Sequence, residues 1–219
     1  MTRRARSLVI ALGVALIAAA GVGAWYITQR ATQDRPIVVS RIGDVALVYA
    51  PAYARFAGGR VGGRIEALDI AATFPDFRPA GDATTPLSDV DGRGKSALVF
   101  LTLGPADRKI DPPDLVATLY ARFLEPEVVE TEEGLLKRRF QDGSPYAGED
   151  LYFAPPEGRT FAARCTRATT PSDGLPETCL TVFRERDLDV SLRFARPLLG
   201  QWNKLAAGAR ALTQTMLAR

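Results

Sequence analysis

Residues 179–195 read CLTVFRERDLDVSLRFA, and this stretch decides the expected fold. Leu188–Phe194 alternates strictly between apolar and polar side chains, which is the pattern of a strand with one buried face. The run Cys179–Arg184 precedes it, and Arg186-Asp187 between the two is typical of a turn. The stretch therefore predicts two neighbouring antiparallel strands.

Further short apolar runs lie upstream and extend this pattern. Turn-forming residues separate them, which favours an antiparallel meander over parallel βαβ units. The expected meander strands are Leu135–Phe140, Leu151–Ala154 and Phe161–Thr166. Earlier in the chain we expect a hairpin of Ile37–Val39 and Val45–Tyr49, a half-buried strand at Leu68–Phe74, and a central strand at Ala97–Leu103. The last of these is almost wholly apolar, so it should be buried on both faces.

Two helices are expected to pack on this sheet. The first begins at Asp111-Pro112, where Asp111 can cap the helix and Pro112 suits its first position. Its predicted core face is formed by Leu115, Leu119 and Phe123. Pro197 opens the second helix, whose apolar stripe consists of Leu198, Trp202, Leu205, Ala209, Leu212 and Met216. The fold class is therefore α+β, with a mainly antiparallel sheet and two helices in residues 37–219.

The N-terminus has the features of a membrane anchor. Leu8–Ile27 holds no charged residue and as a helix spans a bilayer core of about 30 Å. Basic residues 3–6 precede this run, which places the N-terminus in the cytoplasm. Trp25 and Tyr26 lie at its far end, where aromatic side chains favour the membrane interface. We therefore expect a cytoplasmic tail at 1–6, a single-pass signal anchor at 7–27 and a linker at 28–36.

A cleaved signal peptide is the alternative, because Ala18–Ala20 fits a cleavage site. The apolar run continues through Gly21–Ile27, which favours the anchor. In either case the domain is exported. With the favoured anchor, we expect it in the periplasm, attached to a bacterial inner membrane. One helical face carries small residues that could support a homodimer, namely Ala11, Ala15, Ala19 and Gly23.

The only two cysteines, Cys165 and Cys179, lie on neighbouring predicted strands. In an oxidising compartment two such cysteines normally pair, so we expect a structural disulfide. Closing a loop of this size stabilises the fold by about 3 kcal/mol in the chain-entropy model. Two buried free thiols are the alternative. The spacing is not that of a CxxC redox or zinc motif.

The composition argues against several functions. Removing Arg3, Arg4 and Arg6 leaves 28 − 3 = 25 basic residues against 25 acidic ones, so the exported domain is formally neutral. A neutral domain lacks the basic excess of a nucleic-acid binder. The chain has no histidine, which excludes catalysis by a Ser-His-Asp or Cys-His group from this chain alone. The glycine cluster at 58–63 lacks the Lys-Ser/Thr of a phosphate loop, and no cofactor is expected.

Arg164, Arg184 and Arg193 lie on three successive strands of the predicted meander. If those strands pair, the three side chains gather on one face, which could bind an anionic or polymeric partner. The alternative is a solvated face on which Glu185, Asp187 and Asp189 balance the arginines. Tyr146, in the polar loop 141–150, is a further candidate binding residue.

Catalytic candidates are weaker. Ser144 could act as a nucleophile with Glu149, Asp150 or Lys137 as its base, but a hairpin loop of turn residues is the favoured explanation of this cluster. The acidic residues between 127 and 133 are more typical of a solvated loop than of a metal site, so no metal is expected. The sequence thus favours a non-enzymatic binding or accessory protein of the cell envelope that meets an envelope protein or a cell-wall component. The alternative is an anchored envelope hydrolase using carboxylates or a Ser-Lys pair.

Overall fold

The computed structural model describes residues 37–80, 97–107, 109–167 and 177–218. The predicted anchor, its cytoplasmic tail, the linker and the small-residue helical face all lie outside these ranges. Within them, no helix has the length and apolar character needed to cross a membrane.

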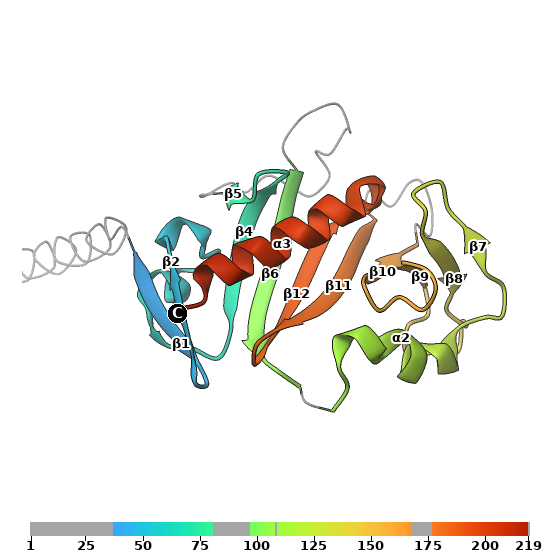
Figure 1. The fold of residues 1–219 in the computed structure, drawn as a ribbon, viewed down its shortest axis with the longest axis horizontal. Coiled ribbons are helices and arrows are strands. Elements are labelled where there is room, and N and C mark those ends of the chain that lie inside the picture. The colour runs from blue at the N-terminus through green and yellow to red at the C-terminus, as the bar shows by residue number, and fades with distance from the viewer. Residues whose placement is uncertain (1–36, 81–96, 108, 168–176, 219) are drawn as a thin grey trace, which may run out of the picture.

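A nine-stranded sheet, entirely antiparallel, forms the centre of the domain (Figure 1). Its strands in spatial order are β5 (Arg78–Pro79), β4 (Leu68–Phe74), β6 (Ala97–Pro105), β12 (Leu188–Ala195), β11 (Thr178–Glu185), β10 (Ala162–Thr166), β9 (Glu149–Phe153), β8 (Leu136–Arg139) and β7 (Val129–Glu130). From β8 to β12 each strand pairs with the next, which confirms the predicted meander. The α+β class with a mainly antiparallel sheet is likewise confirmed.

A separate three-stranded sheet lies at the opposite end of the molecule from β7 (Figure 1). It consists of β2 (Val45–Tyr49), β1 (Val38–Ile42) and β3 (Gly63–Arg64), and the first two form the predicted hairpin. Two 3-10 turns, η1 (Pro51–Tyr53) and η2 (Ala57–Arg60), connect β2 to β3 within this sheet. The end of the chain runs beside β2, because the Ala218 N–H donates to the Ala46 carbonyl at 3.0 Å.

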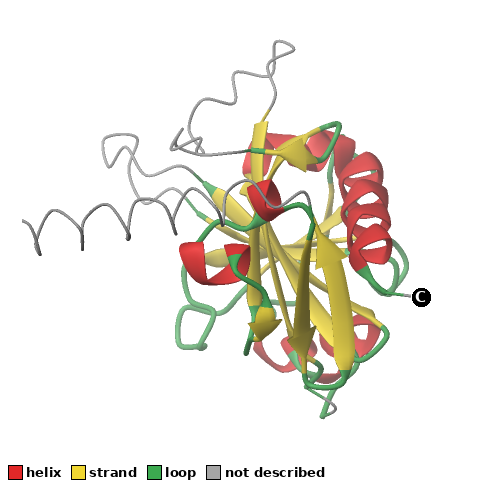
Figure 2. Ribbon diagram, turned by 90° about the vertical axis from the view of Figure 1, so that its left-hand side faces the viewer, coloured by secondary structure: helices red, strands yellow, loops and turns green. Residues whose placement is uncertain are grey.

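Helix α3 (Trp202–Met216) lies across one face of the main sheet, preceded by the 3-10 turn η6 (Arg196–Gln201) (Figures 1 and 2). The predicted stripe is confirmed, since all its members except Trp202 are buried and Trp202 is half-buried. The helix approaches the sheet end closely at Gly208, where a Cβ atom would lie 2.2 Å from Cε2 of Phe77. The last helix is thus docked on the sheet, as expected.

The first predicted helix is broken into three short pieces: η4 (Pro112–Asp114), α2 (Leu115–Thr118) and η5 (Tyr120–Phe123). The predicted core face was wrong by one position. Val116, Tyr120 and Leu124 are buried, whereas the predicted Leu115, Leu119 and Phe123 are only partly buried. The 3-10 turns have about three residues per turn instead of 3.6, so they shift the phase of the apolar stripe.

The predicted cap at Asp111 is also wrong. Its side chain makes no capping hydrogen bond and instead accepts one from Arg184. Pro112 does occupy the first helical position, and it is buried. The turn η4 therefore begins at Pro112, while the side chain of Asp111 contacts Arg184 of β11.

The two helical regions cover opposite faces of the sheet. On β9, Tyr152 belongs to the large core under α3, whereas its neighbours Leu151 and Phe153 belong to the smaller core under α2 and η5. Successive residues of a strand point to opposite faces, so the two cores are separated by the sheet itself. The α2 region covers the β8–β10 end, and η4 also contacts β11, which leaves the middle of this face open.

Strand β6 shows this opening directly. The run Ala97–Leu103 was expected to be buried on both faces, and for its second half this is wrong: Thr102 is exposed and Phe100 is half-buried. Val99, Leu101 and Leu103 on the α3 side are fully buried as expected. The two faces of β6 therefore differ: the face towards α3 lies deep in the core, and the opposite face is only partly covered.

The expected disulfide is present between Cys165 and Cys179. The two residues are direct partners in the β10–β11 pairing, and both lie in the core under α3. The alternative of two free thiols is thereby excluded. A buried disulfide is typical of proteins that fold in an oxidising compartment.

Candidate binding face

The face of the main sheet opposite α3 carries the candidate site. Residues directly opposite one another on paired antiparallel strands point to the same side of the sheet. One such row crosses four strands, because Arg164 pairs with Leu180, Leu180 with Arg193, and Arg193 with Phe100. Arg184 lies four residues after Leu180 on β11 and points to this side as well. The structure thus brings the three predicted arginines onto one face.

Arg184 is occupied by contacts within the protein. Its guanidinium donates to the carboxylate of Asp189 at 2.7 Å, to the carboxylate of Asp111 and to the carbonyl of Asp107 at 2.6 Å. Its pKa is raised, chiefly because of the hydrogen bond to Asp189. The side chain therefore fastens the segment after β6 to β11, and its charge is balanced there.

Arg164 is likewise engaged. It donates to Glu149 at 2.7 Å and stacks over the ring of Tyr146, 4.6 Å from the ring centroid. Tyr146 packs against Phe140 at 4.9 Å between centroids, so this predicted binding residue is part of the smaller core. Burial raises the pKa of the neighbouring Tyr120, and the positive charge of Arg164 partly opposes that rise. Both residues thus contribute mainly to packing.

Arg193 differs from the other two arginines. It is exposed, and its side chain makes no hydrogen bond or ion pair with any residue that the structure describes. Beside it, the guanidinium of Arg55 stacks over the Phe100 ring at 4.6 Å. The two arginines border a hollow of about 220 Å³ on the open face, lined by Arg55, Asp69, Ile70, Phe100, Leu101, Thr102, Leu180, Ser191 and Arg193.

The chemistry of this hollow favours an anionic ligand. Its one carboxylate, on Asp69, already accepts a hydrogen bond from the Thr102 hydroxyl at 2.6 Å. Two guanidinium groups therefore face a single carboxylate, and each guanidinium can bind a carboxylate with two parallel hydrogen bonds. The stacked Arg55 keeps its charge while its flat face is held by an aromatic ring. The hollow thus suits the acidic side chains of a partner.

Sequence reasoning missed Arg55 and Phe100. Arg55 follows a turn with no clear pattern, and it reaches the hollow because its backbone N–H donates to the Asp69 carbonyl at 2.9 Å. Phe100 was assigned to a strand buried on both faces. The only signal in the sequence was Thr102, a polar residue on the same side of that strand.

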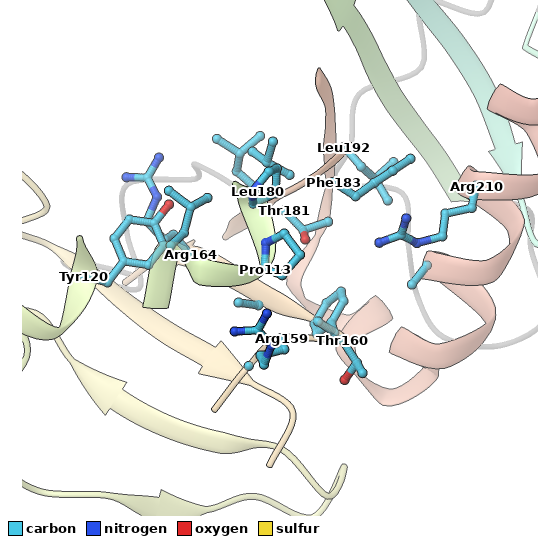
Figure 3. A pocket seen from close by; sticks show the side chains of 17 residues that line it. Pro113, Tyr120, Arg159, Thr160, Arg164, Leu180, Thr181, Phe183, Leu192 and Arg210 are labelled. Carbon is cyan, nitrogen blue, oxygen red and sulfur yellow. The ribbon is translucent and has the colours of Figure 1, made fainter. Parts of the chain in front are cut away.

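A second cavity lies where β10 and β11 diverge. The two strands pair only through Ala163–Cys165, and beyond that point the gap is lined from both faces of the sheet (Figure 3). Figure 3 shows Arg164 and Tyr120 on one side of it and Phe183 and Arg210 on the other. The cavity measures about 40 Å³, which is room for only a few water molecules. It is too small to be the main binding site.

The predicted catalytic candidates are engaged separately. The Ser144 hydroxyl oxygen accepts a hydrogen bond from the Tyr146 N–H at 3.2 Å, which is a turn contact. Lys137 pairs instead with the buried Asp150 at 3.0 Å. Among the described residues, no three acidic or cysteine side chains are grouped so that they could hold a metal ion. Among the residues that the structure describes, no serine and lysine side chains form a catalytic Ser-Lys pair.

The fold resembles known structures. The immunity protein Smlt3025 of the Stenotrophomonas maltophilia type IV secretion system aligns with a TM-score of 0.56 and 14% identity, over 84% of this chain and 94% of its own. The iron-regulated outer membrane lipoprotein FrpD of Neisseria meningitidis aligns with a TM-score of 0.49 and 10% identity, over 85% of this chain and 94% of its own. No protein-family model and no curated protein sequence matches this chain. At these identities the likeness concerns the fold alone.

Proposed function

We propose that this chain is an exported, membrane-anchored accessory protein of the cell envelope, and that its outer domain binds a protein partner. The hollow around Arg193 carries this proposal. It combines two arginines, an aromatic ring and hydroxyl groups on an open sheet face. Arginine and aromatic residues are enriched where protein interfaces hold most of their binding energy.

The contrast among the three arginines locates the site on this face. Arg164 and Arg184 have acidic partners within the domain, so their charges are already balanced. Arg193 has none among the described residues, and its side chain is exposed. A partner that supplies a carboxylate would complete the charge balance of the hollow.

Two further observations support the proposal. The buried disulfide fits an oxidising compartment outside the cytoplasm. The similar fold of an immunity protein is compatible with a domain whose task is recognition of another protein. By this reasoning, the partner presents an acidic segment, and the domain acts by holding it.

Site-specific photo-crosslinking in cells tests the proposal. A benzoylphenylalanine placed at Thr102, in the hollow, is expected to yield one defined protein adduct. The same group at Gln214, exposed on α3, is the matched control and is expected to yield none. An adduct formed equally from both positions would contradict the proposed site.

Charge reversal sharpens this experiment. R193E is expected to reduce the adduct from position 102 by about tenfold or more, because a lost charge-assisted contact costs about 1.5–3 kcal/mol. R122E reverses an exposed arginine outside the hollow and is expected to leave the yield unchanged. Equal yields from both variants would show that Arg193 takes no part in binding.

A further inference from the structure

The outer face of the three-stranded sheet is apolar where a strand facing water would be polar. On β1, Val38, Ser40 and Ile42 point into the core and are buried. Val39 and Arg41 lie between them and are exposed, and Val39, at 59% exposed, is large and apolar. Ile37, the residue just before β1, is also large and apolar and is 58% exposed. More than half of the surface of each of these two residues is therefore exposed.

Val61 extends this apolar surface. It is 53% exposed and belongs to the turn just before β3. This turn lies directly against β1, because a Cβ atom on Gly62 would come within 2.6 Å of the Val39 carbonyl oxygen. Ile37, Val39 and Val61, hereafter the apolar tip, therefore belong to one end of the small sheet.

Exposed charged residues follow the apolar tip along β1 and β3. Arg41 is the next outward residue of β1, and in the parallel pairing with β3 it stands directly beside Arg64. Both are exposed. The acidic residues Asp44 and Glu66 are exposed beyond this pair, past the ends of β1 and β3. Along β1 and β3 the exposed residues thus run from apolar through basic to acidic.

The position of the apolar tip matters because the chain enters the domain there. Only nine residues, 28–36, separate it from the end of the predicted anchor at Ile27. Even fully extended, they reach about 30 Å. If the anchor spans the bilayer, β1 must therefore start close to the membrane surface.

We infer that the apolar tip and the pair Arg41–Arg64 form a membrane-contact surface for a bilayer with anionic headgroups. This inference rests on the anchored state in the proposed function. Apolar side chains enter the headgroup boundary, and the arginines meet lipid phosphates at its level. The acidic end points away, where repulsion from the anionic surface is weakest. The contact would fix how the rest of the domain faces the periplasm.

Photolabelling of the full chain in vesicles tests this inference. The vesicles contain phosphatidylglycerol and phosphatidylcholine, with a photoactivatable phospholipid whose reactive group lies near the headgroup. We expect lipid adducts in the segment 37–48 and at Val61, in addition to the anchor. The exposed pair Val128 and Val129, at the other end of the molecule, is expected to remain unlabelled.

Matched variants separate the contributions. V39S/V61S is expected to lower labelling of the segment 37–48 by about fivefold or more, whereas V128S/V129S leaves it unchanged. R41Q/R64Q is expected to lower it in anionic vesicles but not in vesicles of phosphatidylcholine alone. All substituted side chains are exposed, so these variants should fold normally.

The outcomes distinguish the two levels of the proposal. If residues 8–27 are labelled by the lipid and residues 37–48 are not, the contact surface is overturned and the anchor stays in place. Unlabelled 8–27 overturns the anchor itself, and the inference falls with it. A detergent-stable dimer that V39S/V61S dissociates, with no lipid adducts in the segment 37–48, would assign the surface to a second copy instead.

Discussion

Arg184 and Arg193 lie on neighbouring strands and face the same side of the sheet, yet they serve different ends. Arg184 donates to Asp107, Ile110 and Asp111 in the loop after β6, and to Asp189 on β12. Arg193 binds no described residue. Their contributions to stability should therefore differ even though both are arginines on one face.

Truncating each of them tests this difference. R184A is expected to destabilise the domain by about 1–3 kcal/mol, because it removes the charged partner of the partly buried Asp189 and leaves it only the Asp107 N–H as a donor. R193A should change the free energy of unfolding by less than about 0.5 kcal/mol, as an exposed substitution does. Denaturant unfolding measures both values. A loss for R193A as large as for R184A would mean that Arg193 is a structural residue.

Tyr120 gives the domain a sensitivity to alkaline pH. Burial raises its pKa above that of the unfolded chain, although Arg164 opposes part of this rise. The folded state therefore keeps a proton that the unfolded state loses from about pH 10 upward. The contribution is fully present below that pH and is lost as the pH rises further.

The variant Y120F removes this titration. Its free energy of unfolding should fall less steeply than that of the wild type between about pH 9 and pH 11. Tyr49 and Tyr53, whose pKa values burial also raises, should preserve part of the fall in both proteins. Identical slopes would show that Tyr120 titrates as it does in the unfolded chain.

At this scale the sequence predicted the direction of side chains better than their partners. Strict alternation in β12 placed Arg193 on the polar face of that strand, and the shared side with Arg164 and Arg184 followed only if the strands paired, as they do. The acceptors of Arg184 include Asp111 and the carbonyl of Asp107, which reach it only through the path of the loop after β6. No local pattern encodes such a path.

Helix α3 depends on a glycine for its position on the sheet. A methyl group at Gly208 would come within 2.5 Å of two ring atoms of Phe77. Alanine would favour the helix itself by about 1 kcal/mol, but the clash should cost about 1–3 kcal/mol or more. G208A is therefore expected to lower the melting temperature, despite its better helix propensity.

Two comparisons check this reasoning by thermal unfolding. G200A adds a methyl group where nothing lies within 4 Å, and it should be nearly neutral. F77L/G208A should recover part of the loss, because the smaller side chain makes room. A stabilised G208A would mean that helix and sheet can separate at no cost.

The two helices differ in how well their sequences predicted them. The α3 stripe repeats over many turns, so a regular helix was the simplest solution. The segment 112–123 is short, and its 3-10 turns moved the buried face to Val116, Tyr120 and Leu124. Gly158 allows this arrangement, since a Cβ atom there would lie 2.8 Å from Cγ2 of Val116. That contact comes from a distant loop and leaves no mark on the helical pattern.

For the molecule as a whole, the disulfide joins the two strands at the centre of the meander. Its cysteines are 14 positions apart, and the bond restricts the unfolded chain across that loop. The variant C165A/C179A is expected to lose about 2–5 kcal/mol of stability. Denaturant unfolding under non-reducing conditions measures the loss. Once the wild type has been denatured and reduced, its free energy of unfolding should approach that of the variant. A wild-type value that reduction leaves unchanged would contradict the disulfide between Cys165 and Cys179.

The overall architecture was predicted in outline. Short alternating runs and turn signals were enough for the meander. These patterns could not show that β1 and β2 lie outside the main sheet and form a second sheet with β3. That separation depends on contacts with the opposite end of the chain, such as the hydrogen bond from Ala218 to Ala46.

The edges of the two described sheets offer little room for pairing with a further strand. In the main sheet the outermost strands, β5 and β7, have two residues each, and Pro79 in β5 has no N–H to donate. In the small sheet, β3 is equally short, and the chain from Leu217 to Ala218 lies along β2. Another chain can therefore gain little by adding a strand to either sheet. Such a domain resists edge-to-edge aggregation in a crowded compartment, and any partner has to recognise it through its side chains.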